Sequence, residues 1–502
     1  MGAHFSVRTS TILGIEALPV DVEVDVSSGL PSFTIVGLPD MAVQEARERV
    51  RAAVKASGFD FPGARVVVNL APGPLRKHGT GFDLPIATAL LAATHQIPQA
   101  PLADAAVVGE LSLDGTVRSV PGMLAHALRA RATGVLFGPP DSDGAASLES
   151  LEYRPLRHLR DLLDPRALRL AQSSGRPRLM RNADDMSDVC GQDFAKRALE
   201  IAAAGGHNVL TVGPPGSGKT MLARRLAGIL PPLSTDERLS TALVHSVAGL
   251  DDSDALAGIR PFRAPHHSCS MAGLVGGGSP PRPGEVSLAH NGVLFLDEMP
   301  EFGPAALQAL RQPLEDGHVV LVRADGRVRF PTRIALVGAA NPCPCGFFGD
   351  PDRPCTCPPA VVVRYQGRIG GPLLDRIDMY VRIERVDPRR ILNGSPGEPS
   401  ETVRTRVARA REVSAIRGVA SNAVLSGAPL LAACLLSMQA RERVEEHASI
   451  HHLSGRGITR LLRVARSIAD LETCERVSEL HIDEASGFRM ETGGTTRVPR
   501  MC

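Results

Sequence analysis

Residues 213–220 read Gly213-Pro214-Pro215-Gly216-Ser217-Gly218-Lys219-Thr220, which matches the pattern GxxxxGK[ST]. The apolar run 209–212 precedes this stretch, and a segment with helical spacing follows it from about Met221. A strand, a glycine-rich turn and a helix in this order form a phosphate-binding loop, because backbone N–H groups and the helix N-terminus both face the anion. We therefore predict a site for ATP at which Lys219 contacts the β- and γ-phosphates and Thr220 binds Mg²⁺.

Two further predicted strands end in polar side chains suited to the same site. The apolar run 292–296 is followed by Asp297 and Glu298, and the run 333–340 is followed by Asn341. Such sites form where the carboxyl ends of parallel strands meet. We predict that Asp297 holds Mg²⁺ through its water shell, that Glu298 acts as general base, and that Asn341 orients the attacking water. A plain turn residue before a proline is the alternative for Asn341.

The pattern around these motifs divides the chain into an α/β protein of several domains. Residues 1–167 mix strands of alternating apolar residues with amphipathic helices, and 168–186 read as a linker rich in polar residues, Gly and Pro. In 187–395, short apolar runs alternate with helical segments, which indicates a parallel sheet flanked by helices. Residues 396–495 have helical spacing throughout, and 496–502 form a tail.

Composition limits the classes of partner. The net charge is only +2, which falls short of the strongly basic footprint of a dedicated DNA-binding domain. Aromatic residues make up 3% and Trp is absent, so any nucleic-acid contact must use backbone charge rather than base stacking. The sequence has no 18-residue apolar run and no signal-peptide pattern, so we predict a cytoplasmic protein without membrane contact.

Four of the nine cysteines crowd into one short stretch, in the pattern CxC-x9-CxC formed by Cys343, Cys345, Cys355 and Cys357. Four thiolates in two close pairs can bind a structural Zn²⁺ tetrahedrally and fasten a loop that has no core of its own. Four reduced cysteines in a loop rich in Pro and Gly are the alternative.

Longer strings of sequence resemble the magnesium-chelatase-like YifB/ComM family and cover nearly the whole chain in domain order. The strings are GLPSFTIVGLPD, EARERVRAAVKASGF, VGPPGSGKT, RPFRAPHHS, PGEVSLAHNG, GVLFLDEMPEF, GAANPCPCG, GPLLDRID and SGRGITRLLRVARSIADL. The resemblance implies an N-terminal domain with a Lon-protease-like fold, an AAA+ core and a C-terminal helical lid. It also implies a homo-hexameric ring, and ComM members are DNA helicases that drive branch migration during natural transformation.

The same resemblance implies roles for residues outside the phosphate loop. Arg376 matches the arginine finger, which would reach the γ-phosphate bound by the neighbouring subunit. Arg456 matches the lid arginine, or sensor 2, with Arg460 and Arg463 as alternatives one and two turns further on. The segment 189–192, which ends at Gln192, matches the part of the family that contacts adenine.

A Lon-like peptidase needs a Ser nucleophile and a Lys base, and the sequence provides neither. Aligned on the family, the nucleophile position falls at Gly81, beside Thr80, and the Lys position falls at Leu124. Glycine has no nucleophile and leucine cannot act as a base. We therefore predict that the N-terminal domain is a scaffold or a DNA-binding surface and not a protease.

A predicted hairpin supplies candidate DNA contacts. The apolar runs 319–322 and 327–330 flank Ala324-Asp325-Gly326, a typical turn between two strands. In related AAA+ helicases such a hairpin points into the pore of the ring, where Arg323, Arg327 and Arg329 would contact DNA phosphates without reading sequence. An ordinary solvent-exposed hairpin is the alternative.

Three functions are compatible with these features. The first is a hexameric ATPase that moves on single-stranded or branched DNA. The second is the motor subunit of a chelatase that inserts Mg²⁺ into a porphyrin, against which the long Lon-like domain argues. The third is a nucleotide-gated scaffold without enzymatic activity, which the intact Asp297, Glu298 and Arg376 disfavour.

Overall fold

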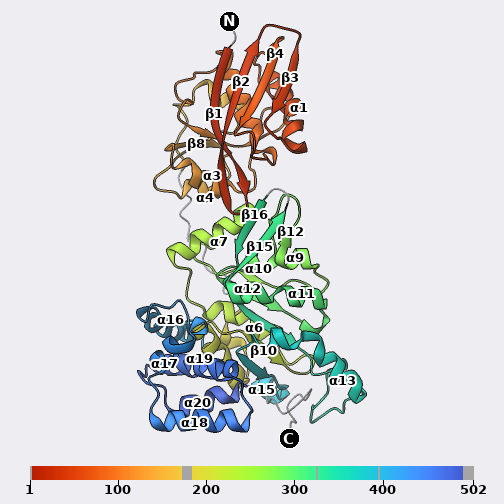
Figure 1. Ribbon diagram of the computed structural model, residues 1–502, viewed down its shortest axis with the longest axis vertical. Coiled ribbons are helices and arrows are strands. Elements are labelled where there is room, and N and C mark those ends of the chain that lie inside the picture. The colour runs from red at the N-terminus through yellow and green to blue at the C-terminus, as the bar shows by residue number, and fades with distance from the viewer. Residues whose placement is uncertain (1–2, 172–183, 324–325, 394–395, 490–502) are drawn as a thin grey trace.

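The computed structural model describes residues 3–171, 184–323, 326–393 and 396–489. These form three bodies along the long axis of the molecule (Figure 1), which we call the N-terminal domain (3–171), the core (184–393) and the C-terminal domain (396–489). In the described ranges, no helix is both long enough and apolar enough to cross a bilayer.

The N-terminal domain is built on a mixed seven-stranded sheet with the order β3-β4-β2-β1-β5-β8-β9. The strands are β1 (Ala3–Leu13), β2 (Glu16–Ser27), β3 (Ser32–Val36), β4 (Arg65–Ala71), β5 (Ala106–Val107), β8 (Val135–Gly138) and β9 (Glu152–Pro155). A two-stranded ribbon, β6 (Glu110–Leu111) with β7 (Val117–Arg118), adjoins it. The helices are α1 (Met41–Ala56), α2 (Asp83–Ala93), α3 (Met123–Ala130) and α4 (Asp143–Ala146).

Helix α1 shows how local sequence sets these elements. The side chain of Asp40 accepts a hydrogen bond from the backbone N–H of Val43 and caps the first turn. Val43, Val50 and Val54 recur at helical spacing and are fully buried, so one face of α1 packs against the rest of the domain. Residue type and spacing thus set both the start of α1 and its buried face.

The core contains a five-stranded sheet in which all strands are parallel, in the order β11-β14-β17-β10-β18. The strands are β10 (Val209–Val212), β11 (Phe262–Arg263), β14 (Gly292–Leu296), β17 (Ile334–Ala340) and β18 (Met379–Arg382). All five residues of β14 are buried, because helices cover both faces of the sheet. The parallel sheet predicted from the alternating pattern is thus confirmed.

Helices and two small ribbons surround this sheet. The helices are α5 (Asp193–Gly205), α6 (Lys219–Ile229), α7 (Thr235–Val247), α8 (Ser253–Leu256), α9 (Met271–Val275), α10 (Glu285–Leu288), α11 (Pro304–Ala309), α12 (Arg311–Asp316), α13 (Pro359–Gln366), α14 (Gly371–Leu374) and α15 (Pro388–Asn393). The ribbons are β12 (Gly276–Gly277) with β13 (Arg282–Pro283), and β15 (His318–Arg323) with β16 (Gly326–Pro331).

The C-terminal domain is entirely helical within its described residues. Its helices are α16 (Ser400–Ile416), α17 (Gly427–Cys434), α18 (Met438–Ile450), α19 (Gly455–Leu471) and α20 (Glu479–Gly487). Leu461, Ala465 and Ile468 on α19 are fully buried, and they belong to the same apolar cluster as residues of α5 and β10. The C-terminal domain therefore shares one hydrophobic core with the sheet that carries the phosphate loop.

The N-terminal domain rests on the core at two places (Figure 1). At the start of α3, the backbone N–H of Gly122 donates to the carbonyl of Ser246 in α7 at 2.7 Å. Beside it, the β15–β16 ribbon buries Val328 and Phe330 in a small cluster that includes Leu13 and Ile15 from the β1–β2 turn. The base of the predicted hairpin is thus held against the N-terminal domain.

Candidate nucleotide site

Sheet topology brings the three predicted segments of the site together. Strand β10 pairs with β17 and β17 pairs with β14, so the three strands are neighbours and point the same way. Val212 lies opposite Ala340, and the loop 213–220, Asn341 and Asp297 each follow the carboxyl end of one strand. Sequence alone predicted the strand ends, and the parallel register explains why they meet.

Direct hydrogen bonds connect these segments. Lys219 Nζ donates to the carbonyls of Gly213 at 2.8 Å and Pro214 at 2.9 Å, and to Asn341 Oδ1 at 3.1 Å. Thr220 Oγ1 donates to Asp297 Oδ2 at 2.7 Å. Lys219, Thr220, Asp297 and Asn341 therefore lie around one space, as the sequence predicted.

The conformation of the loop requires its glycines. Gly216 and Gly218 have φ of +76° and +88°, in the left-handed region that residues with side chains disfavour. A Cβ on Gly213 would lie 2.2 Å from the carbonyl oxygen of Ile383, so the backbone can pass this strand only without a side chain. The hydroxyl of Ser217 is buried and has no hydrogen-bond partner among the described residues.

The groups present fit a nucleoside triphosphate with Mg²⁺. Hydroxyl and carboxylate oxygens, here from Thr220 and Asp297, are ligands that Mg²⁺ prefers. Burial lowers the pKa of Lys219, while the negative charges of Asp297 and Glu298 act in the opposite direction. Its ammonium group rests on carbonyls of the loop itself, where phosphate oxygens can replace those acceptors.

Glu298 is held in an unusual backbone conformation next to Asp297, the predicted Mg²⁺ ligand. Its φ is +49°, and its backbone N–H donates to Asp297 Oδ1 at 2.9 Å. His267 Nδ1 lies 3.5 Å from Glu298 Oε2, and the ring of His267 packs at 4.1 Å on that of His266. Both histidines belong to the string RPFRAPHHS, and the sequence alone predicted no role for them.

Only the sheet explains the contact between His267 and Glu298. Strand β11 pairs with β14, so the loop after β11 reaches the end of β14 although 30 residues separate the two. The available signal in the sequence was a pair of histidines shortly after a strand, which alone does not indicate a partner.

Gln192, from the segment that resembles the adenine-contacting part of the family, lies at the border of the phosphate loop. It caps the N-terminus of α5, and its Nε2 donates to the carbonyl of Glu384 at 2.5 Å and to that of Ser217 at 3.5 Å. The segment 189–192 therefore connects the phosphate loop with the chain that follows β18.

The predicted finger and sensor arginines share a different surface cavity. Arg376 and Arg456 both line it, and no residue of 213–220 does. Arg376 Nη2 lies 2.6 Å from Glu315 Oε2, whereas Arg456 is 71% exposed and lies 3.9 Å from Asp375. The structure thus places both arginines together, on a surface other than the one that holds Lys219.

Arg460 and Arg463, the two alternatives for the sensor arginine, bind backbone carbonyls outside this cavity. Arg460 donates to the carbonyls of Leu374 and Ile377, and Arg463 donates to the carbonyl of Leu425 at 2.5 Å. Both guanidinium groups are therefore occupied by backbone carbonyls, and Arg456 is the most accessible of the three.

The four cysteines of the CxC pairs converge as the metal prediction requires. Their Sγ atoms all lie within 4.8 Å of one another, with Cys343 and Cys345 3.3 Å apart and Cys345 and Cys355 3.5 Å apart. The loop also contacts the phosphate loop, because a Cβ on Gly346 would lie 2.4 Å from the Pro215 ring. Four sulfur atoms at this spacing form a donor set suited to Zn²⁺.

The arginines of the predicted DNA hairpin lie on its open side. In β15 and β16, Arg323, Arg327 and Arg329 are exposed, while Val328 and Phe330 are buried. This alternation follows from the period of two in a strand. The predicted turn at Ala324-Asp325 lies outside the described residues.

The positions aligned with a peptidase dyad lie in apolar surroundings. A Cβ on Gly81 would contact the side chains of Val108 and Val120, and Leu124 is fully buried. The hydroxyl of the neighbouring Thr80 donates to Glu110.

The five-stranded parallel sheet, its phosphate loop and the carboxylate at the neighbouring strand end define a P-loop nucleotide-binding core. The family described as "Magnesium chelatase, subunit ChlI" matches residues 185–391. "Subunit ChlI of Mg-chelatase" matches 22–137, and "Magnesium chelatase, subunit ChlI C-terminal" matches 397–489. The chain belongs to the YifB/ComM family of magnesium-chelatase-like AAA+ proteins.

The relatives that establish this family cover almost the whole chain. A protein named YifB from Salmonella typhimurium is 44% identical over 493 residues, which span 96% of each chain. Competence protein ComM from Haemophilus influenzae is 40% identical over 489 residues, 95% of this chain and 96% of its own length. Lon protease 2 of Bacillus subtilis is 32% identical over only 145 residues, 27% of this chain, so its similarity is partial.

Proposed function

We propose that this AAA+ protein is an ATP-hydrolysing motor that works as a homo-hexameric ring on DNA. The observation that carries the proposal is the convergence of Lys219, Thr220, Asp297 and Asn341 at adjoining strand ends. Membership of a magnesium-chelatase-like family supports ATP and Mg²⁺ as its substrate and cofactor.

The chemistry follows from the positions of these groups. Mg²⁺ held by Thr220 and Asp297 would neutralise charge on the phosphates. Lys219 exchanges its carbonyl acceptors for phosphate oxygens, and Asn341 orients the attacking water. Glu298 accepts the proton of that water, and such general-base catalysis contributes about 10²–10⁴-fold. His267, near Glu298 Oε2, restricts where this carboxylate can point.

A ring assembly is supported by the location of Arg376 and Arg456. Both line one exposed cavity that no residue of the phosphate loop shares, which suits a role at the site of a neighbouring subunit. An arginine supplied to the γ-phosphate in this way contributes about 10³–10⁵-fold in rate. In this proposal the C-terminal domain acts as the lid that moves with each round of hydrolysis.

The DNA part of the proposal rests on the hairpin arginines and on one relative. Arg323, Arg327 and Arg329 offer exposed positive charges that suit phosphates of any sequence. A relative of nearly equal length is named as a competence protein, and from the family resemblance we propose branch migration on DNA that enters recombination. With no Trp and few aromatic residues, the contact depends on charge and weakens with salt.

The ATPase rate of the purified protein tests this function. It should be measured without DNA, with a single strand and with a four-way junction, each at two salt concentrations. We expect the junction to stimulate turnover most, and high salt to reduce the stimulation. A rate that no DNA changes would overturn the DNA part of the proposal and leave the ATPase part to its own measurement.

A second candidate is the motor subunit of a magnesium chelatase, which the wording of the three family descriptions favours. The relatives aligned over 95–96% of the chain carry the names YifB and ComM instead. Assays of porphyrin metalation and of strand displacement, on the same preparation, separate the two functions.

We also propose that Cys343, Cys345, Cys355 and Cys357 hold one structural Zn²⁺. Four sulfur ligands leave no open coordination position, so the ion would have no catalytic part. It would fasten the loop that touches Pro215 and so support one wall of the nucleotide site.

For the N-terminal domain, we propose a Lon-like fold that serves as scaffold or DNA surface and has no peptidase activity. The partial similarity to Lon protease 2 supports the fold. The apolar surroundings of Gly81 and Leu124 support the loss of the dyad, because neither a nucleophile nor a base is present there.

A further inference from the structure

The backbone that carries Arg376 is held from two sides. This segment, 374–378, connects α14 with β18. From the outer side, Arg460 Nη1 on α19 donates to the carbonyl of Leu374 at 3.1 Å and to that of Ile377 at 3.0 Å. From the inner side, Asn208 Nδ2 donates to the carbonyl of Arg376 itself at 2.9 Å. The guanidinium of Arg460 therefore binds one carbonyl before Arg376 in the chain, that of Leu374, and one after it, that of Ile377.

The contact of Arg460 with the segment 374–378 is largely buried and has a defined geometry. The side chain of Arg460 is only 11% exposed, and its Nη2 lies 3.5 Å from Asp375 Oδ1. A planar guanidinium can hold two acceptors in a fixed relative position, which a rotating ammonium group does poorly. Arg460 thus fixes the conformation of the segment as well as its location.

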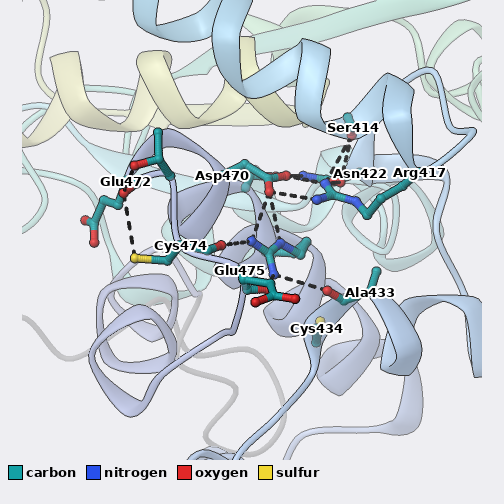
Figure 2. Close-up of polar contacts among 12 residues, drawn as sticks. Ser414, Arg417, Asn422, Ala433, Cys434, Asp470, Glu472, Cys474 and Glu475 are labelled. Atoms are coloured by element: carbon teal, nitrogen blue, oxygen red, sulfur yellow. Dashed lines mark hydrogen bonds and ion pairs between the residues drawn. The ribbon is translucent and has the colours of Figure 1, made fainter.

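The helix that bears Arg460 is itself locked into the C-terminal domain. Near the end of α19, buried Asp470 accepts hydrogen bonds from Arg417 and from Asn422 (Figure 2). Arg466, 1% exposed, also bonds to Asp470 and donates to the carbonyls of Ala433, Cys474 and Glu475. Because these contacts reach α17 and the turn before α20, α19 moves together with its domain.

The inner contact leads to the nucleotide site of the same subunit. Asn208 immediately precedes β10, which runs into the phosphate loop. Its backbone N–H donates to Asp378 Oδ2 at 3.2 Å, and its Oδ1 accepts from Leu336 N at 2.9 Å in β17. The finger segment is thus fastened to two strands of the sheet on one side and to the C-terminal domain on the other.

We propose that Arg460 is a positioning residue that couples the finger Arg376 to the C-terminal domain. The inference rests on the proposed function, in which Arg376 acts on ATP bound by a neighbouring subunit. When the C-terminal domain shifts with the nucleotide state of its own subunit, the two carbonyls bound by Arg460 move with α19, and the finger is withdrawn from or presented to the neighbour. Arg460 touches no nucleotide in this arrangement.

The test compares Arg460→Ala with a matched control, Arg404→Ala. Arg404 on α16 also donates two hydrogen bonds to a core carbonyl, that of Gly228 at 2.9 and 2.6 Å, but it does not touch the finger segment. We expect R460A to lower kcat about 10²-fold, the loss that misplacement of a catalytic group by about 1 Å causes. Nucleotide affinity, measured with a fluorescent ATP analogue, and thermal stability should match those of R404A.

A complementation assay separates a misplaced finger from a damaged fold. Co-expressed rings of R460A and Glu298→Gln subunits contain interfaces where an intact finger from E298Q faces an intact site of R460A. We expect these mixed rings to hydrolyse ATP several-fold faster than either variant alone, as rings of R376A and E298Q should. In the R376A background, R460A should cause no further loss.

The outcomes distinguish this inference from the function on which it rests. If R376A and E298Q fail to complement, or R376A retains the wild-type rate, the shared-site function is wrong. If R376A and E298Q do complement each other, three results would each show that the coupling role of Arg460 is wrong. These are a wild-type rate for R460A, a failure of R460A to complement E298Q, and a full further loss of rate when R460A is added to R376A.

Discussion

The core and the N-terminal domain both pack helices on a sheet, but they differ in the side chains found at the positions predicted or aligned as catalytic. In the core, Lys219 donates a hydrogen bond to Asn341 and Thr220 donates one to Asp297, where three strands end. In the N-terminal domain, the aligned peptidase positions hold Gly81 among valines and a buried Leu124. The comparison teaches that helices packed on a sheet do not by themselves define a chemistry, which depends on the residues that the fold brings to one place.

The largest effect expected from this comparison concerns the finger. Arg376→Ala should reduce kcat by about 10³–10⁵-fold, since it removes a charge that acts on the transferring phosphoryl group. Its own phosphate loop remains intact, so ATP affinity should stay unchanged. Thr80→Ala in the N-terminal domain is the control, and its ATPase rate should equal that of the wild type. If Arg376→Ala and Thr80→Ala lost the same amount of ATPase activity, the proposed difference in catalytic role between the core and the N-terminal domain would be wrong.

The next effect separates binding from turnover within the core. Glu298→Gln should retain ATP binding and lose about 10²–10⁴-fold in kcat, because the amide cannot accept the proton of the attacking water. Lys219→Ala should instead lose binding, which equilibrium titration with a fluorescent ATP analogue measures. Normal hydrolysis by purified E298Q would show that another group is the base.

Removal of the metal proposed at the cysteines should have a moderate effect. We expect one zinc per chain by elemental analysis and none in a variant with Cys355→Ser and Cys357→Ser. This variant should melt at lower temperature and bind ATP more weakly, because its loop packs on Pro215. The reference variant is Cys474→Ser, an exposed cysteine outside the cluster, which should keep both metal and stability. A zinc-free wild type would overturn the metal prediction.

The smallest expected effect is a dependence of stability on pH. In the N-terminal domain and in the core, one buried histidine with a lowered pKa should cause it. Burial lowers the pKa of His126 in the N-terminal domain and of His290 in the core to about 4, against 6.5 for an exposed histidine. Between these values the unfolded chain binds more protons than the folded one. Stability is therefore lost as the pH falls below 6.5, by roughly 1.4 kcal/mol per pH unit for each histidine.

Urea unfolding at pH 7 and pH 5 measures this dependence. His126→Gln should flatten it for the transition of the N-terminal domain, and His290→Gln for that of the core. An unchanged slope in either variant would show that folding does not lower the pKa of that histidine.

The sequence predicted those parts of the fold and site that depend on local patterns. The glycines of the phosphate loop, the apolar run of β14 and the helical spacing of α19 each indicated an element that the structure contains. The contact between His267 and Glu298 was not predicted, because it depends on β11 lying beside β14. The first strand of the chain, β1, was also missed, and its eleven residues are recognisable only through their pairing with β2.

By itself, the sequence predicted a phosphate-binding loop, a strand followed by two carboxylates, and membership of a known family, because these depend on residue type and spacing along the chain. Only the tertiary structure decided that Arg376 and Arg456 share a cavity apart from the phosphate loop, and that Arg460 binds the backbone on both sides of Arg376. Those relations join residues more than 70 positions apart, and their distances depend on how helices pack against the sheet.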